Sequence, residues 1–276
     1  MELEGRRALV TGGGRGIGRS IALALAREGA RVGLMARSRE ELEAVAGEIE
    51  GLGGATWMGT ADVSRPEEVR MVIGELLDAW DGIDVLVNNA GIQGPIGLAH
   101  EVPVEEWIHT IQVNLVGCYL CTRLVLPGMI ERSYGKIVNL SGGGAVSPRP
   151  RYSAYGAAKA GVVRLTESLA AEVAEYGIDV NAMAPGAINT KMLEETLAAG
   201  EAAGAQEQAG AKRQLESGGT DPALPARLVV YLASSRSDGL TGRLISAMWD
   251  EWGELDVEGV MATEAFTVRR IKLEET

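Results

Sequence analysis

Short apolar runs alternate with amphipathic segments along most of the chain. The run at residues 8–10 ends in a glycine cluster at residues 12–18, after which apolar residues recur at helical spacing as far as Gly29. Apolar positions three and four apart share one face of a helix, so this order predicts a strand, a loop and a helix. Residues 31–35 and 55–59 predict two further strands.

Two expected helices begin with the residue pair of a capping box. Ser38 is followed by Glu41, and Ser64 by Glu67, each three positions later. In such a box the serine side chain accepts an N–H of the first turn, and the acid returns to the serine N–H. We therefore expect helices to start directly after both serines.

The second half of the chain repeats this alternation. Four more strands are predicted at residues 83–87, 136–141, 178–184 and 243–247, with helices through Asn114, over residues 152–176 and over residues 222–233. Seven strands alternating with helices predict an α/β fold with one doubly wound parallel sheet and right-handed crossovers. No composition shift marks a second domain, so we expect a single Rossmann-type domain over residues 1–276.

Two segments depart from the alternation. Residues 187–220 are rich in Ala, Gly and Glu, and are too small and polar for a core of their own. We expect a mobile lid there, with an ordinary surface insertion as the alternative. After the last strand, the chain leading into the tail at residues 250–276 carries apolar side chains that a solvated terminus does not need, namely Trp249, Trp252, Val260, Met261, Phe266 and Ile271. We expect it to pack, across a subunit interface.

Composition and charge exclude several classes of protein. The 276 residues are 46% hydrophobic and 23% charged, which is typical of a globular chain, and the net charge of −12 opposes binding to nucleic acid. No stretch approaches 18 consecutive apolar residues, and residues 1–4 lack the basic and apolar regions of a signal peptide. We expect a cytoplasmic protein without a membrane partner.

The two cysteines, Cys118 and Cys121, have the C-x-x-C spacing of a redox pair or half a zinc site. A zinc site needs further ligands, yet the only histidines are His100 and His109. Residues 111–130 have the apolar spacing of a helix. We therefore expect two packing residues one turn apart and no metal site.

A glycine-rich turn follows the first strand, with the spacing Thr11-Gly12-x-x-x-Gly16-x-Gly18. Ligands of open α/β sheets lie beyond the carboxyl ends of the strands, and helix N-terminal N–H groups favour an anion such as a pyrophosphate. The spacing is one residue wider than the common dinucleotide fingerprint. Taken by itself, this glycine pattern is explained nearly as well by a turn with a purely structural role.

Ser141, Tyr155 and Lys159 form a second candidate group. Tyr155 and Lys159 are four residues apart on an expected helix and so share a face, and Ser141 ends the strand before it. A tyrosine has a pKa of about 10 and needs a nearby positive charge to exchange a proton near neutrality. Lys159 is placed to supply that charge, although a solvated helix face is the commoner explanation for an isolated pair.

With the Asn88-Asn89-Ala90-Gly91 run and Asn114, the sequence resembles the short-chain dehydrogenase/reductase family, in particular its members similar to 3-oxoacyl-acyl-carrier-protein reductases. The resemblance spans residues 6–249. Its other motifs are the glycine-rich turn, Asp62-Val63, Ser141, Tyr155-x-x-x-Lys159, and Pro185-Gly186 followed by Thr190.

The resemblance implies hydride transfer between a nicotinamide and a carbonyl or secondary alcohol. It assigns four catalytic residues. In reduction Tyr155 would protonate the developing alkoxide and Ser141 would hydrogen-bond the substrate oxygen. Lys159 would lower the pKa of Tyr155 and hold the nicotinamide ribose, and Asn114 would position a water in the proton relay.

The resemblance also assigns the cofactor-binding residues. Asp62 would meet the adenine amino group beside Val63, and the Ile188 backbone and the Thr190 hydroxyl would anchor the carboxamide. The full set is Thr11, Gly12, Arg15, Gly16, Ile17, Gly18, Arg37, Asp62, Val63, Asn89, Ala90, Gly91, Tyr155, Lys159, Pro185, Gly186, Ile188 and Thr190.

Which nicotinamide binds is an electrostatic question. Members using NAD usually carry an acid near the end of the second strand, whereas this chain has Met35-Ala36-Arg37-Ser38. Arg37 and Arg15 could clamp a 2′-phosphate, because arginine suits bidentate phosphate contact. We therefore expect NADP(H), with NAD(H) still possible.

The substrate is less constrained. Residues 142–151 and 187–220 would line the pocket, and Arg149 and Arg151 could attract an acidic substrate, although solvated loop charges are the commoner explanation. Arg132 could meet an acidic acyl carrier, but acids at Glu172 and Glu175 on the next helix disfavour one. We expect a small carbonyl or alcohol substrate and a homo-oligomer, a dimer or tetramer as is typical of the family.

Two alternatives belong to other classes. A nucleotide-sensing or scaffold protein of this fold would show damage in the Ser, Tyr, Lys and Asn set, which is intact. A methyltransferase binding adenosylmethionine gives no reason for Tyr155 and Lys159.

Overall fold

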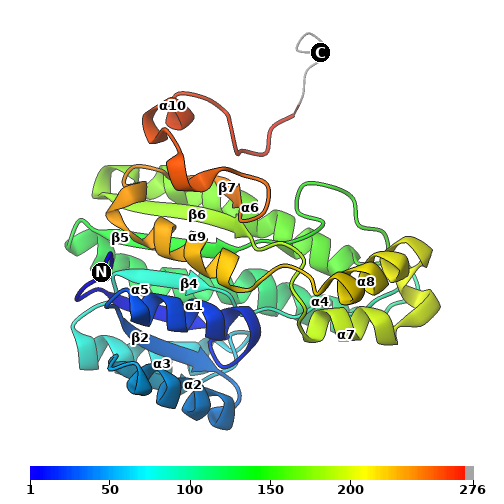
Figure 1. Cartoon of the computed structure of the whole chain (residues 1–276), viewed down its shortest axis with the longest axis horizontal. Helices are drawn as coiled ribbons and strands as arrows, with labels where there is room; N and C mark the ends of the chain where they lie inside the picture. Colours follow the sequence, from blue (N-terminus) through cyan, green and yellow to red (C-terminus); the bar gives the residue numbers. More distant parts are fainter. Residues whose placement is uncertain (271–276) are drawn as a thin grey trace.

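The fold is built on one parallel sheet. The structure is a computed structural model, and it describes residues 1–270. Seven strands lie in the order β3-β2-β1-β4-β5-β6-β7 (Figure 1), which confirms the predicted fold class. The strands are β1 (Arg7–Thr11), β2 (Arg31–Ala36), β3 (Thr56–Thr60), β4 (Val85–Asn88), β5 (Gly135–Leu140), β6 (Ile178–Ala184) and β7 (Leu244–Ser246).

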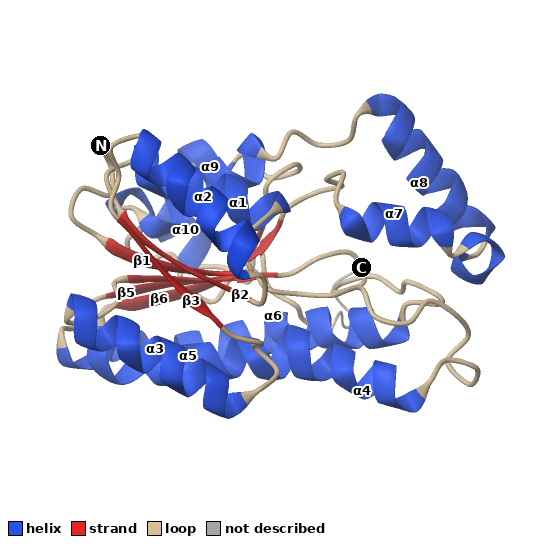
Figure 2. Ribbon diagram, turned by 90° about the horizontal axis from the view of Figure 1, so that it is seen from below, coloured by secondary structure: helices blue, strands red, loops and turns tan. Residues whose placement is uncertain are grey.

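Helices cover both faces of the sheet (Figure 2). One face carries α1 (Gly16–Arg27), α2 (Arg39–Gly51) and α9 (Ala223–Ala233); the other carries α3 (Pro66–Trp80), α4 (Val104–Ile111), α5 (Gly117–Glu131) and α6 (Ser153–Val173). Each face has its own apolar core: Ala8 and Val10 of β1 belong to one, and Leu9 to the other, as the two-residue period of a strand requires. Short helical turns lie at Ala174–Tyr176 and Ser235–Ser237.

The two expected capping boxes differ in outcome. Ser38 caps α2 as predicted and accepts the Glu41 N–H at 3.3 Å. The box at Ser64 is wrong, because Ser64 donates its N–H and its hydroxyl to Asp62 Oδ1 at 2.9 and 2.7 Å. The helix α3 begins instead at Pro66, since proline lacks an N–H and its fixed φ suits the first helical position.

The predicted long helix through Asn114 is interrupted. A π-turn over Gln112–Val116, η1, separates α4 from α5, and Asn114 lies within it. By length and composition alone, residues 104–131 could cross a membrane. This stretch contacts β4, β5, α3 and α6, and we interpret it as a core helix of the domain.

Both cysteines lie on α5 and are buried. Burial raises the pKa of both thiols, to about 12 for Cys118. The Cys118 thiol donates to Asn139 Oδ1 at 3.3 Å, and Asn139 also accepts from Asn88 Nδ2 at 2.8 Å and donates to Thr166 Oγ1 at 2.9 Å. A buried polar network thus joins β4, β5, α5 and α6.

Residues 187–220 form two helices beyond the carboxyl ends of the strands (Figure 2). These are α7 (Lys191–Ala198) and α8 (Ala205–Ser217), joined by η3 (Gly200–Ala203). Ala203 packs in a small apolar cluster with Tyr152 and Tyr155. The segment therefore covers the start of α6.

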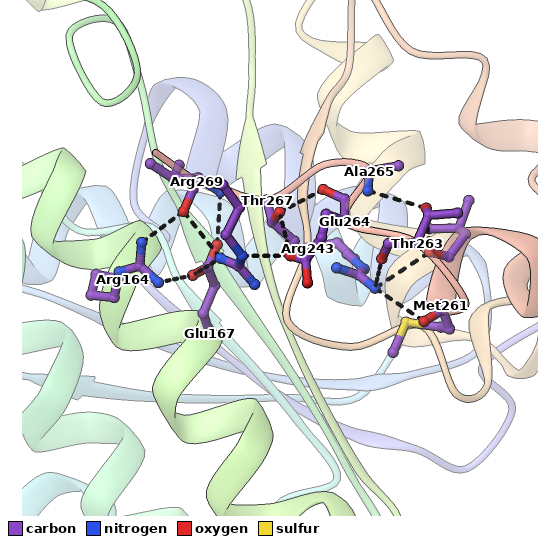
Figure 3. A network of polar contacts seen from close by, with 11 residues as sticks. Arg164, Glu167, Arg243, Met261, Thr263, Glu264, Ala265, Thr267 and Arg269 are labelled. Atoms are coloured by element: carbon purple, nitrogen blue, oxygen red, sulfur yellow. Dashed lines mark hydrogen bonds and ion pairs between the residues drawn. The ribbon is translucent and has the colours of Figure 1, made fainter. Parts of the chain in front are cut away.

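The described part of the tail, residues 250–270, packs against its own chain; Ile271 lies outside the described residues. It contains η5 (Trp252–Glu254) and α10 (Val257–Met261), whose apolar side chains join the core beside α9. Within this chain the expectation for Trp249 is wrong, because its side chain lies 84% exposed just before the tail. Polar contacts continue the attachment (Figure 3): Arg243 donates to the Thr263 carbonyl at 2.9 Å, and Glu167 accepts from Val268 N–H and Arg269, both at 2.9 Å.

Candidate active site

The glycine-rich turn brings β1 directly onto the start of α1. Gly12 and Gly16 have φ of +64° and +53°, in the left-handed region that favours glycine. A Cβ at Gly18 would lie 2.1 Å from the Gly12 carbonyl oxygen, so no side chain fits there. Arg15 caps α1 without a side-chain hydrogen bond, and the first turn has no acid. The free N–H groups of this helix end therefore suit an anion such as a pyrophosphate.

Thr11 and Asn89 hold this turn against the end of β4. The Thr11 hydroxyl accepts the N–H groups of Asn89 and Ala90, both at 3.0 Å. The Asn89 side-chain amide donates to the carbonyls of Thr11 at 2.8 Å and Gly12 at 3.1 Å. These bonds explain why the Asn89-Ala90-Gly91 run accompanies the glycine-rich turn.

Asn114 and Lys159 meet beside Gly91. The Asn114 side chain accepts the Ile92 N–H at 2.9 Å and donates to the Ile92 carbonyl at 2.8 Å. A Cβ at Gly91 would lie 2.6 Å from Asn114 Oδ1 and 3.6 Å from Lys159 Nζ. Lys159 donates to the Leu140 carbonyl at 2.7 Å, and burial lowers its pKa to about 8.

Ser141 and Tyr155 complete the predicted catalytic group. The Ser141 hydroxyl is buried and has no hydrogen-bond partner among the described residues. A Cβ at Gly142, the residue that follows Ser141, would lie 2.5 Å from the Tyr155 hydroxyl, so the phenol ends against the backbone directly after Ser141. Because burying an unpaired hydroxyl is costly, this group is prepared for an outside acceptor such as a substrate oxygen.

Besides Lys159, a second positive charge lies near the Tyr155 ring, on a residue to which the sequence does not assign this role. Burial raises the pKa of Tyr155, and the Arg149 guanidinium opposes that rise. Lys159 Nζ lies 5.7 Å from the Tyr155 ring centre, and Arg149 Cζ lies 5.8 Å from it. The sequence indicates Arg149 only as an attractor for an acidic substrate, because spacing does not show which way a loop side chain turns.

Arg15 and Arg37 lie at the far end of the glycine-rich turn. Arg37 is 3.9 Å from Asp62, and Arg15 is 3.8 Å from Glu41, distances too long for hydrogen bonds. The two arginine side chains remain 61% and 56% exposed, which leaves both able to meet a phosphate. The neighbouring Val63 is buried.

The remaining predicted cofactor residues lie between β6 and α7. Gly186 has a φ of +86°, and Ile188 is buried. A Cβ at Gly16 would lie 3.8 Å from Thr190 Cγ2, which places Thr190 beside the glycine-rich turn. Pro185 and Gly186 thus start a segment that returns across the carboxyl edge of the sheet. Ile17, in the first turn of α1, packs on the core.

Comparisons with known proteins agree with this arrangement. A family model described as short chain dehydrogenase matches residues 6–200. The chain is 39% identical to 3-oxoacyl-(acyl-carrier-protein) reductase of Staphylococcus aureus strain Mu50 over 244 residues, covering 87% of this chain and 95% of that protein.

Two solved structures are also similar. NAD⁺-bound xylitol dehydrogenase has a TM-score of 0.83 at 28% identity, covering 89% of this chain and 98% of that one. A single-substitution variant of actinorhodin polyketide ketoreductase with NADPH has a TM-score of 0.81 at 30% identity, covering 88% and 95%.

The unpartnered Ser141 hydroxyl leads to a testable prediction. Ser141→Ala should leave the free energy of unfolding unchanged or raise it by up to about 1 kcal/mol, because it removes an unsatisfied buried group. Carbonyl reduction should nevertheless fall by roughly a hundredfold, through loss of a hydrogen bond to the substrate oxygen. Chemical denaturation and steady-state kinetics measure the two effects. A destabilised variant with normal turnover would contradict the assignment.

Proposed function

Because this chain belongs to the short-chain dehydrogenase/reductase family, it is an NAD(P)-dependent oxidoreductase acting on a CH–OH or C=O group, and we propose that it works as an NADPH-dependent ketone reductase. The observation that carries the proposal is the buried, unpartnered Ser141 hydroxyl together with the Tyr155 phenol, which ends against the following residue, Gly142. A ketone oxygen bound there can accept both hydrogen bonds.

The side chains then have separate tasks. A bound nicotinamide supplies the hydride. Ser141 donates a hydrogen bond to the carbonyl oxygen, and Tyr155 gives its proton to that oxygen as negative charge develops. Lys159 holds the ribose. The Asn114 amide is hydrogen-bonded to the Ile92 backbone, so it fixes the loop after β4. From this position Asn114 would hold a water of the proton relay.

The cofactor residues favour NADPH over NADH. The open N-terminus of α1 and the close approach of Gly12 and Gly18 would hold the pyrophosphate. Arg37 and Arg15 would bind the 2′-phosphate, and Asp62 the adenine amino group. Hydrogen bonds from Ser64 and the charge of Arg37 outweigh burial and lower the pKa of Asp62, which keeps it ionised.

The substrate that we propose is a small ketone or secondary alcohol free of a protein carrier. Arg132, the candidate carrier contact, donates to the Ile83 carbonyl at 2.7 Å and lies 3.8 Å from Asp84, so its charge is used inside the chain. Glu172 and Glu175 are exposed on the neighbouring helical segment and would repel an acidic carrier. A panel of ketones, quinones and acyl thioesters tests this choice.

We further propose a cytoplasmic homo-oligomer, a dimer or tetramer, in which residues 187–220 act as a lid and the tail lies near a subunit interface. The lid is attached to the loop before α6 through Arg149 with Glu207 at 2.7 Å and through Arg151 with the Ala202 carbonyl at 3.1 Å. The lid is also held by the buried hydrogen bond from Gln93 Nε2 to Thr196 Oγ1 at 2.8 Å and by the apolar contact of Ala203 with Tyr152 and Tyr155.

Tyr155→Phe should lower turnover by about a thousandfold and leave NADPH binding nearly unchanged, because it removes the transferable proton and little volume. Tyr152→Phe is the matched control, since its hydroxyl makes only a 3.4 Å contact to Thr196. Stopped-flow NADPH oxidation and cofactor fluorescence measure the two quantities. Wild-type turnover in Tyr155→Phe would exclude this mechanism.

Arg37→Asp should move the ratio of specificity constants from NADPH toward NADH by about tenfold or more, because it replaces a phosphate contact with repulsion. Arg39→Asp serves as the control, since Arg39 is exposed and paired with Glu43. A wild-type enzyme that already prefers NADH would show that Arg37 does not select the cofactor.

Trypsin should cut the free protein first at Lys212 or Arg213, which are exposed on α8, and NADPH should slow those cuts by ordering the lid. Cleavage at Arg269 in the tail is the internal control and should not depend on NADPH. Mass spectrometry of timed digests identifies the sites. Equal cutting of α8 with and without NADPH would contradict a lid, and first cuts in the tail would contradict its packing.

A further inference from the structure

Arg149 lies against the two tyrosines of the site. It comes from the loop between β5 and α6, and its side chain is only 22% exposed. Its Cζ atom is 3.9 Å from the centre of the Tyr152 ring and 5.8 Å from that of Tyr155. At these distances a guanidinium interacts with the ring faces and stabilises a nearby phenolate.

Glu207 balances this charge from a different part of the chain. It lies on α8, 58 residues away in sequence, and its Oε2 accepts from Arg149 Nη2 at 2.7 Å. The Glu207 side chain is 29% exposed, so water screens the pair only in part. Since Glu207 belongs to the lid segment, this ion pair exists only while α8 is docked on the loop.

The other ionisable groups around Tyr155 are not coupled to α8. Lys159, on the same helix as Tyr155, donates to the Leu140 carbonyl, and its ammonium lies 5.7 Å from the Tyr155 ring centre, so it adds a positive charge whether or not α8 is docked. Cys118 of α5 stays a neutral thiol, because burial raises its pKa to about 12. Tyr152 is itself a buried phenol whose pKa is raised. Among these groups, the pair of Arg149 and Glu207 is the one that links the charge near the phenol to the position of α8.

We propose that Arg149 and Glu207 are positioning residues that govern how readily the Tyr155 hydroxyl gives up its proton. Arg149 favours the ionised phenol, and Glu207, carried by α8, offsets that charge. A docked α8 thus favours the protonated phenol that reduction of a ketone requires. When α8 is undocked, Glu207 no longer offsets the charge of Arg149, and the ionised phenol is favoured. The catalytic consequence rests on the proposed role of Tyr155 as the acid.

The test is a titration that needs no substrate. Tyrosinate absorbance in the near ultraviolet is followed against pH for wild type, Arg149→Met, Glu207→Gln and the control Lys212→Met, and from each curve the curve of the same protein carrying Tyr155→Phe is subtracted. The difference isolates Tyr155. Circular dichroism gives the highest pH at which each protein is still folded. If the Tyr155 midpoint lies above that pH, the fraction of ionised Tyr155 at that pH is compared between the proteins instead.

The two variants should shift the Tyr155 midpoint in opposite directions. Loss of the positive charge in Arg149→Met should raise it, and loss of the negative charge in Glu207→Gln should lower it, each by about half a unit or more. Lys212→Met should leave it in place, since Lys212 is an exposed charge on α8 and is not part of the pair between Arg149 and Glu207. The alkaline limb of the pH profile for NADPH-dependent ketone reduction should move with the midpoint.

A merely structural ion pair predicts shifts of the same sign in both variants, or none, and either result would overturn the proposal. If Arg149→Met does not fold, the test rests on Glu207→Gln, whose substituted side chain is partly exposed. A downward shift of the Tyr155 midpoint in that variant would support the proposal, and its absence would overturn it. The titration is independent of turnover. An active Tyr155→Phe enzyme would therefore defeat the proposed function, whereas unshifted titrations with an inactive Tyr155→Phe enzyme would defeat only this inference.

Discussion

The hydrogen bonds between Thr11 and Asn89 are the constraint on which the site depends. They join the ends of β1 and β4, the two strands at which the chain changes direction across the sheet. On one side they fix the glycine-rich turn, and on the other they fix the course of the chain to Gly91, against which Asn114 and Lys159 lie. Backbone positions thus set the spacing between the cofactor end and the catalytic end.

Much of this arrangement could be predicted from the sequence, because it follows from regular periods. The two-residue period of the strands and the helical spacing between them specify a parallel sheet whose carboxyl ends share one edge. Ser141 directly follows β5 and Tyr155 lies in the first turn of α6, so the topology alone brings them to that edge. Their side-chain directions then follow from the pleat and the helix face.

The features that could not be predicted are decided by individual side-chain contacts, some between near neighbours and others between segments far apart in sequence. Ser64 is positioned to cap a helix, yet Asp62 takes its hydrogen bonds and Pro66 sets the helix start. Arg149 lies in a loop, where direction has no sequence period; its place is set by the Tyr152 ring and by Glu207, which is remote in sequence. The tail is attached through Glu167 and Arg243 in the same manner.

The π-turn between α4 and α5 has a consequence for how the chain can change. Each residue of a helix turns it by about 100°, so the extra residue of a π-turn sets the angular phase between the helices on either side. Deleting one residue from Gln112–Val116 would make the hydrogen bonding regular but would rotate α5 relative to α4, turning Cys121 and Val125 out of the core. The apolar packing of α5 therefore maintains the irregular hydrogen bonding around Asn114. Substitutions within Gln112–Val116 should disturb this packing less than a change in the number of residues there.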